Sequence, residues 1–178
     1  MNTKIKTIKW LSKILHFCLL ITAIVLVMAI AAQIVLMVIA PTLDLANIKF
    51  TGMWGSVPVP IDGGVSEFRA ASLSEVLRAV IITAILYITS YMFKDISSKD
   101  SPFTRKIANR LRVISILIIA LSIVVQPLIA LLTIIFFPDV NFQIFIRLEY
   151  LIFAAVFICL AFIFEYGAEL QQQSDETL

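Results

Sequence analysis

Side chains suited to metal or nucleophilic chemistry are few in this 178-residue chain and do not cluster. The only histidine is His16, and the only cysteines are Cys18 and Cys159. Their spacing does not match a zinc site, and the cysteines lie in apolar stretches where they serve as small packing residues. No P-loop, HExxH sequence or nucleophile elbow is present, and no base is placed to activate a serine, threonine or tyrosine. We therefore expect no catalytic, metal or cofactor site, and the chain is not expected to be an enzyme.

A basic segment between the second and third apolar stretches has the spacing of an amphipathic helix. Asp100 or Ser101 can cap this helix, with Pro102 in its first turn. It then carries, among apolar positions, Phe103, Arg105, Lys106, Asn109, Arg110 and Arg112. Such a helix would lie along the membrane surface, where each cation near anionic lipid contributes about 1 kcal/mol. Membrane anchoring and docking of a cytoplasmic protein both remain open. Nucleic-acid binding is not expected, since no aromatic stacking platform accompanies the charges.

The C-terminal tail carries the opposite charge. Residues 165–178 contain four carboxylate side chains and no Lys or Arg. Glu165 and Glu169 are four residues apart, so they share one face if the last helix continues. We expect them to pair with Arg105, Arg110 or Arg112; a solvated tail is the alternative. The candidate interaction face is therefore Phe103, Arg105, Asn109, Arg110, Arg112, Glu165, Tyr166, Gly167 and Glu169.

Two glutamines are the most polar groups at depth in the apolar stretches, Gln33 and Gln126. In lipid, a glutamine needs a hydrogen-bond partner on a neighbouring helix, a contact worth about 0.6–2 kcal/mol. Pro127 frees a carbonyl near Ile123 and is expected to kink its helix. We expect both glutamines to serve packing, with the lining of a ligand or ion path as the alternative. No charged residue is expected at mid-span, which argues against a proton relay or ion pump.

Four apolar stretches must position these residues. The chain is 61% hydrophobic and 15% charged, whereas soluble domains have about 45–50% apolar and about 25% charged residues. The bilayer is therefore the solvent for most of the chain, and one span needs about 20 apolar residues. Ser72-Leu73-Ser74-Glu75 resembles a capping box, which predicts that the second helix starts near Leu73. The expected fold is a single all-α domain, a four-transmembrane-helix bundle with spans at about 14–40, 73–93, 113–137 and 144–164.

The distribution of Lys and Arg predicts the orientation. Ten lie before the first span or in the basic loop 94–112, and four lie on the opposite side. By the positive-inside rule both termini are cytoplasmic, as are the amphipathic basic loop and the acidic tail 165–178. The loop 41–72 is then extracytoplasmic and structured, because its segments Ile48–Trp54 and Val57–Ile61 can pair as a short hairpin. This loop is either an ordered connection or a docking surface for an external ligand.

Two motifs in the second half carry a family resemblance. One is Asp100-Ser101-Pro102-Phe103 with Asn109-Arg110-Leu111-Arg112; the other runs from Phe164 to Gln171 and ends with Asp175-Glu176-Thr177-Leu178. With the four-span layout, these motifs make the chain resemble the bacterial membrane-protein family catalogued as domain of unknown function 2975. The first half is similar only in hydropathy. The resemblance implies a small four-helix protein of the bacterial cytoplasmic membrane, of a kind often encoded beside a small helix-turn-helix DNA-binding protein.

The expected function is regulation through a protein partner. The basic helix and acidic tail would form a cytoplasmic platform for a partner such as a small helix-turn-helix regulator. The alternative is protection of the membrane against an antimicrobial peptide, or transport of a small solute by a homo-oligomer, because four helices make a thin wall. Small residues permit close helix packing within or between subunits, namely Ala79, Thr83, Ala154, Ala155 and Ala161.

Overall fold

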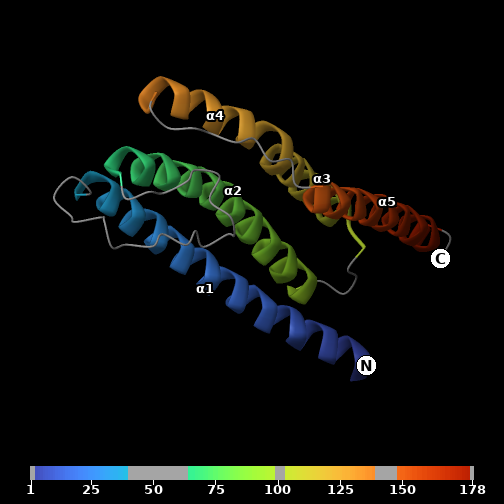
Figure 1. Ribbon diagram of the computed structural model, residues 1–178. Coiled ribbons are helices and arrows are strands. Elements are labelled where there is room, and N and C mark those ends of the chain that lie inside the picture. Colours follow the sequence, from blue (N-terminus) through green and yellow to red (C-terminus); the bar gives the residue numbers. More distant parts are fainter. Residues whose placement is uncertain (1–2, 40–63, 99–102, 139–147, 177–178) are drawn as a thin grey trace. The chain divides into compact units, whose positions relative to one another are not determined.

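The computed structural model describes residues 3–39, 64–98, 103–138 and 148–176, and every regular element within them is a helix (Figure 1). The elements in order are α1 (Thr3–Ile39), α2 (Val65–Ser98), α3 (Arg105–Ile119), the π-helix η3 (Ala120–Val124), α4 (Val125–Phe136) and α5 (Leu148–Glu176). The helices α3, η3 and α4 follow one another without a break. Four helices are long and apolar enough to cross a membrane: Lys6–Ile39, Val65–Ser98, Arg105–Phe136 and Leu148–Ser174.

The all-helical fold with four candidate spans agrees with the expectation from composition. Large apolar side chains are exposed along the helices, including Met28 at 68%, Ile134 at 64% and Ile152 at 65%. Water would oppose that exposure, whereas hydrocarbon does not, so these surfaces are suited to lipid. The architecture is that of a multi-pass helical membrane protein and is consistent with a helical bundle.

The start of α2 differs from the prediction. The helix begins at Val65, where Gly64 accepts the hydrogen bond of the Phe68 N–H at 3.1 Å, and not near Leu73. Glu67 in the first turn complements the positive helix N-terminus. Ser72 and Ser74 are therefore interior residues of the helix and are buried. The capping-box prediction is wrong because the same Ser-x-x-Glu pattern also occurs inside helices whose serines bond elsewhere.

This earlier start also bears on the expectation that no charged residue lies at mid-span. Glu75 and Arg78 lie well inside the 34-residue helix α2, and both are buried, at 6% and 7% exposure. They form an ion pair one turn apart, with 3.6 Å between Arg78 Nη1 and Glu75 Oε1. Pairing of this kind is what makes burial of two charges tolerable.

The third span contains the irregularity that Pro127 predicts. A proline has no N–H for the helical ladder, and its ring clashes with the carbonyl four residues earlier, which here is Ile123. The structure accommodates this with the π-helix Ala120–Val124 directly before α4. Single π-turns inside α-helices relieve such local misfits.

The chain packs as two compact units. Unit 1 comprises Met1–Ile24, Ala84–Ile119 and Leu148–Leu178, and unit 2 comprises Val25–Thr83 and Ala120–Arg147. In unit 1, α3 packs along α5. Its core includes two clusters of buried residues, with Met92, Ile107, Leu111 and Ala161 in one, and Ile114, Ile118 and Ala154 in the other.

Small residues on α5 permit the close packing in unit 1. Ala154 and Ala161 lie seven residues apart on one face of α5 and are at most 1% exposed. Phe157, between them in sequence, packs against both clusters. Close helix packing at these two alanines therefore occurs within the chain, whereas Ala155 is exposed.

Polar contacts join α1 to α2 in unit 2. Gln33 Nε2 donates to Ser72 Oγ at 2.9 Å, so the interhelical bond predicted for Gln33 is present. Arg69 Nε donates to the Met37 carbonyl at 3.2 Å, which satisfies a carbonyl in the last turn of α1.

Several expectations fall outside the described residues. These are the hairpin Ile48–Trp54 and Val57–Ile61 in the outer loop, the helix start at Asp100–Pro102, and the beginning of the fourth span at Ile144.

Candidate interaction face

The basic segment forms the first turns of the third span. It is helical from Arg105 onward and continues directly into the apolar part of α3. Thr104 precedes it, and the Thr104 carbonyl accepts the N–H groups of Ile107 and Ala108 at 3.0 and 3.2 Å. The Thr104 hydroxyl is 3.4 Å from the Ile107 nitrogen, in the position of an N-cap. Thr104 therefore caps α3 as the structure describes it.

Phe103 links the beginning of α3 to the end of α5. Its ring lies 5.3 Å from that of Phe164, at 46° between planes. A Cβ atom on Gly167 would lie 2.6 Å from Phe103 Cδ1, closer than carbon atoms approach without displacement. Glycine at 167 therefore leaves the space that the Phe103 ring fills, and the two family-like motifs are in contact here.

An ion pair joins the same two helices. Arg112 Nη2 on α3 donates to Glu165 Oε2 on α5. The guanidinium carbon of Arg112 also lies 5.6 Å from the centre of the Phe162 ring, a cation–π distance. One of the pairings expected between the basic segment and the tail is thus present. Both side chains are partly exposed, so the pair contributes modestly to stability.

Arg110 has a different partner from the one expected. Its Nη1 lies 2.9 Å from Asp95 Oδ2 on α2, and Lys106 Nζ lies 3.1 Å from the same oxygen. Of the three arginines expected as alternative partners of the tail, Arg112 pairs with Glu165, and Arg110 pairs with Asp95 instead. A signal for Asp95 was present in the sequence, because a carboxylate in the last turns of a helix faces the negative end of the helix dipole and requires a cationic neighbour.

The remaining members of the candidate face point outward. Arg105, Asn109, Tyr166 and Glu169 are exposed, Tyr166 at 63%. Neither Arg105 nor Glu169 forms an ion pair with any residue in the described part of the chain, which corrects the expected pairing of Glu169. The face thus divides into residues that fix the helix ends of unit 1 and residues that remain exposed.

His16 makes a contact that the sequence did not predict. Its Nδ1 lies 2.7 Å from Ser90 Oγ and 3.0 Å from the Ser90 carbonyl, while Ser90 Oγ donates to the His16 carbonyl at 3.1 Å. A carbonyl only accepts, so its contact with Nδ1 places the proton on this nitrogen. This reciprocal pair fixes α1 to α2 in unit 1 and accounts for the histidine without a metal.

The side chain of Gln126 is buried in α4, and the described residues do not show the bond expected for its oxygen. It is 5% exposed, and its Oε1 has no hydrogen-bond partner among the residues that the structure describes. Thr133 lies two turns further along α4, is fully buried, and its hydroxyl oxygen is likewise unbonded within the described residues. No bond at Gln126 Oε1 in the described part of the chain supports the predicted contact with a neighbouring helix, and the packing role of Gln126 stays a prediction.

The described residues include no group of three or more His, Cys, Asp or Glu side chains that could hold a metal ion. Cys18 and Cys159 are free thiols with exposed side chains. No protein-family model, curated protein or solved structure matches the chain.

Proposed function

We propose that this chain is a regulatory protein of the bacterial cytoplasmic membrane, with both termini inside and the segment 41–63 outside. The proposal rests on the four candidate spans and on the excess of Lys and Arg, ten against four, flanking one side. It also rests on the resemblance of the two C-terminal motifs to the family of domain of unknown function 2975. In this placement the contacts of Phe103, Arg112 and Glu165 lie at the cytoplasmic side.

The proposed activity is to hold a cytoplasmic protein partner, such as a small helix-turn-helix regulator. The observation that carries this proposal is the division of the candidate face. Asp95, Arg110, Arg112 and Glu165 are used in ion pairs within unit 1. Four chemically distinct groups remain exposed, namely Arg105, Asn109, Tyr166 and Glu169.

This division suits recognition, because a binding surface gains affinity when the residues that hold it in place are ordered before the partner binds. Tyrosine and arginine are the residue types that most often dominate interface energies. Tyr166 offers a large side chain with few rotatable bonds, and Arg105 and Glu169 offer opposite charges for selecting a partner.

The test is copurification from native membranes. Arg105→Glu combined with Tyr166→Ala changes two exposed groups and none of the ion pairs in unit 1. We expect this variant to reach the membrane at normal abundance and to lose the partner that copurifies with the wild type. Lys6→Glu is the matched control, because Lys6 is an exposed cation on α1, outside the candidate face. Retention of the partner by the double variant would reject the platform.

A second candidate, passage of a small solute through an oligomer, is favoured by one observation. The oxygens of Gln126 and Thr133 are buried and lack partners among the described residues, an arrangement that a bound solute or water would satisfy. Gln126→Cys, placed in a chain without Cys18 and Cys159, tests this candidate. Labelling by a hydrophilic thiol reagent would indicate a hydrated path, and complete protection would exclude one at this residue.

A further inference from the structure

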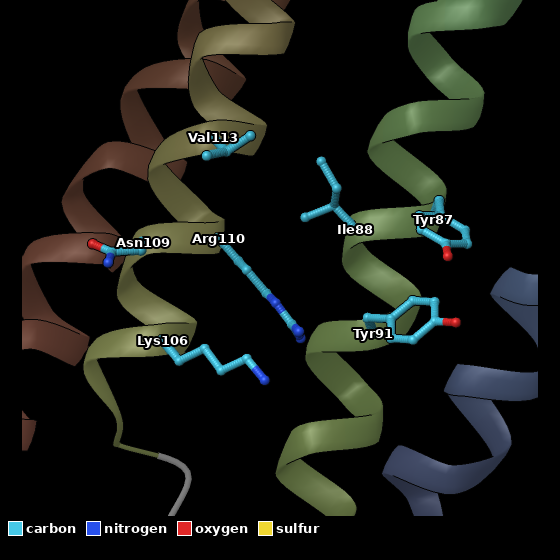
Figure 2. Close-up of a pocket in the computed structure, with 7 residues that line it drawn as sticks. All are labelled: Tyr87, Ile88, Tyr91, Lys106, Asn109, Arg110 and Val113. Carbon is cyan, nitrogen blue, oxygen red and sulfur yellow. The ribbon is translucent and has the colours of Figure 1, made fainter.

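A cavity of about 470 Å³ opens between α2 and α3 within unit 1 (Figure 2). Helix α2 contributes Tyr87, Ile88 and Tyr91 to its lining, and α3 contributes Lys106, Asn109, Arg110 and Val113. The four α3 residues are spaced i, i+3, i+4 and i+7, so they occupy one face of the helix. Of the four exposed groups of the proposed partner platform, Asn109 lines this cavity, whereas Arg105, Tyr166 and Glu169 do not.

The cavity is polar at one end and apolar at the other. Figure 2 shows Arg110 reaching from α3 towards Tyr91, with Lys106 one turn nearer the start of α3. Ile88 and Val113 lie above Tyr91 and Arg110 in this view, and Ile88 points towards α3. Val113 is 44% exposed and Ile116, one turn beyond it, is 62% exposed. The apolar end therefore continues onto a surface suited to hydrocarbon.

The polar end retains a positive charge. Lys106 and Arg110 supply two positive charges and Asp95 supplies one negative charge, which leaves one net positive charge. Lys106 remains 59% exposed at its side chain, so it can contact a further anion.

We propose that this cavity binds the phosphodiester headgroup of an anionic glycerophospholipid, with an acyl chain along the apolar end. Ammonium and guanidinium groups are the usual phosphate ligands, and the Asn109 amide can donate a further hydrogen bond. A tyrosine beside them is typical of the level where headgroups meet hydrocarbon. A soluble phosphate would leave the apolar end unused, whereas a phospholipid matches both ends.

Native mass spectrometry of the delipidated full chain tests this assignment. The probes are phosphatidylglycerol and phosphatidylcholine with identical acyl chains. We expect phosphatidylglycerol to bind more tightly, and Lys106→Gln to weaken its binding about fivefold. Val113→Phe, which narrows the cavity without changing charge, should weaken it as well. Arg105→Gln is the matched control, since it removes an exposed cation one residue away that does not line the cavity, and it should leave the affinity unchanged.

Three results would overturn the proposal. Equal binding of the two lipids would remove the headgroup preference. Equal losses in Lys106→Gln and Arg105→Gln would indicate general surface charge instead of a site. Displacement of phosphatidylglycerol by excess inorganic phosphate would assign the cavity to a soluble anion. Each variant is first checked for wild-type helical content by circular dichroism, so a loss of binding is not read from an unfolded chain.

Discussion

Arg112 on α3 donates a hydrogen bond to Glu165 on α5, and its guanidinium also lies over the ring of Phe162. Together with the contact between Phe103 and Gly167, this pair joins the two motifs that carry the family resemblance. The motifs are far apart in sequence but meet in one packed group. A large part of their residue pattern is therefore explained by helix packing, and only its exposed members are available to a partner.

Loss of the Arg112–Glu165 pair should destabilise the protein modestly. Because both side chains are partly exposed, we expect Glu165→Gln to lower the free energy of unfolding by about 0.5–1 kcal/mol. Denaturant titration in detergent measures this change. Glu169→Gln is the control and should have no effect, since Glu169 has no ion pair in the described residues. Equal effects of the two substitutions would argue against the pair.

The contact between Phe103 and Gly167 predicts that Gly167→Ala changes the thermal stability in opposite directions with and without the Phe103 ring. In an ordinary helix, Gly→Ala stabilises by about 1 kcal/mol. At position 167 the added Cβ would collide with the Phe103 ring, so we expect Gly167→Ala to lower the thermal midpoint. In a Phe103→Ala background the same substitution should raise it. Stabilisation in both backgrounds would show that the ring and the glycine do not constrain each other.

The reciprocal bonds between His16 and Ser90 should be energetically coupled. We expect Ser90→Ala to lower the free energy of unfolding by about 1 kcal/mol, within the range for hydrogen bonds between membrane helices. His16→Phe and Ser90→Ala together should cost less than the sum of the two single changes. Thr89→Val serves as the comparison, because the Thr89 hydroxyl donates to the Ile85 carbonyl of its own helix. Strictly additive losses would contradict the pairing.

Thr133 and Thr83 provide a matched pair for buried hydroxyl groups. Thr83 donates to the Ala79 carbonyl at 2.7 Å, whereas the Thr133 hydroxyl is unbonded in the described residues. We expect Thr133→Val to raise the free energy of unfolding by about 1 kcal/mol, because an unsatisfied polar group is removed. Thr83→Val should lower it or leave it unchanged. A loss at Thr133 would instead indicate a bound solute or water and would favour the transport candidate.

The number of candidate spans could be predicted from the sequence because the solvent is hydrocarbon. Apolar length alone decides which segments can cross it, and backbone hydrogen bonding then requires helix. The same reasoning anticipated a bonded Gln33 and an irregularity near Pro127, since both follow from local chemistry. The start of α2 was missed because the sequence contains two competing helix-start signals. One is Gly64 with Glu67, and the other is Ser72 with Glu75.

The pairings in the candidate face were only partly predictable. Complementary charge indicated that α3 and the tail would meet, and Arg112 and Glu165 do meet. Which arginine faces which helix depends on the rotation of each helix about its axis, and sequence does not specify that rotation. Arg110 therefore pairs with Asp95, and Glu169 remains exposed. The bond between His16 and Ser90 was missed for the same reason, since 74 residues separate them.

The central claim is a four-span protein whose exposed charged face lies in the cytoplasm. The most direct measurement places a single cysteine at the end of α5, as Ser174→Cys, in a chain lacking Cys18 and Cys159. An impermeant maleimide should fail to label it in intact cells and should label it after permeabilisation, whereas Ser56→Cys should be labelled in intact cells. Labelling of Ser174→Cys in intact cells would contradict the orientation, and with it the cytoplasmic platform.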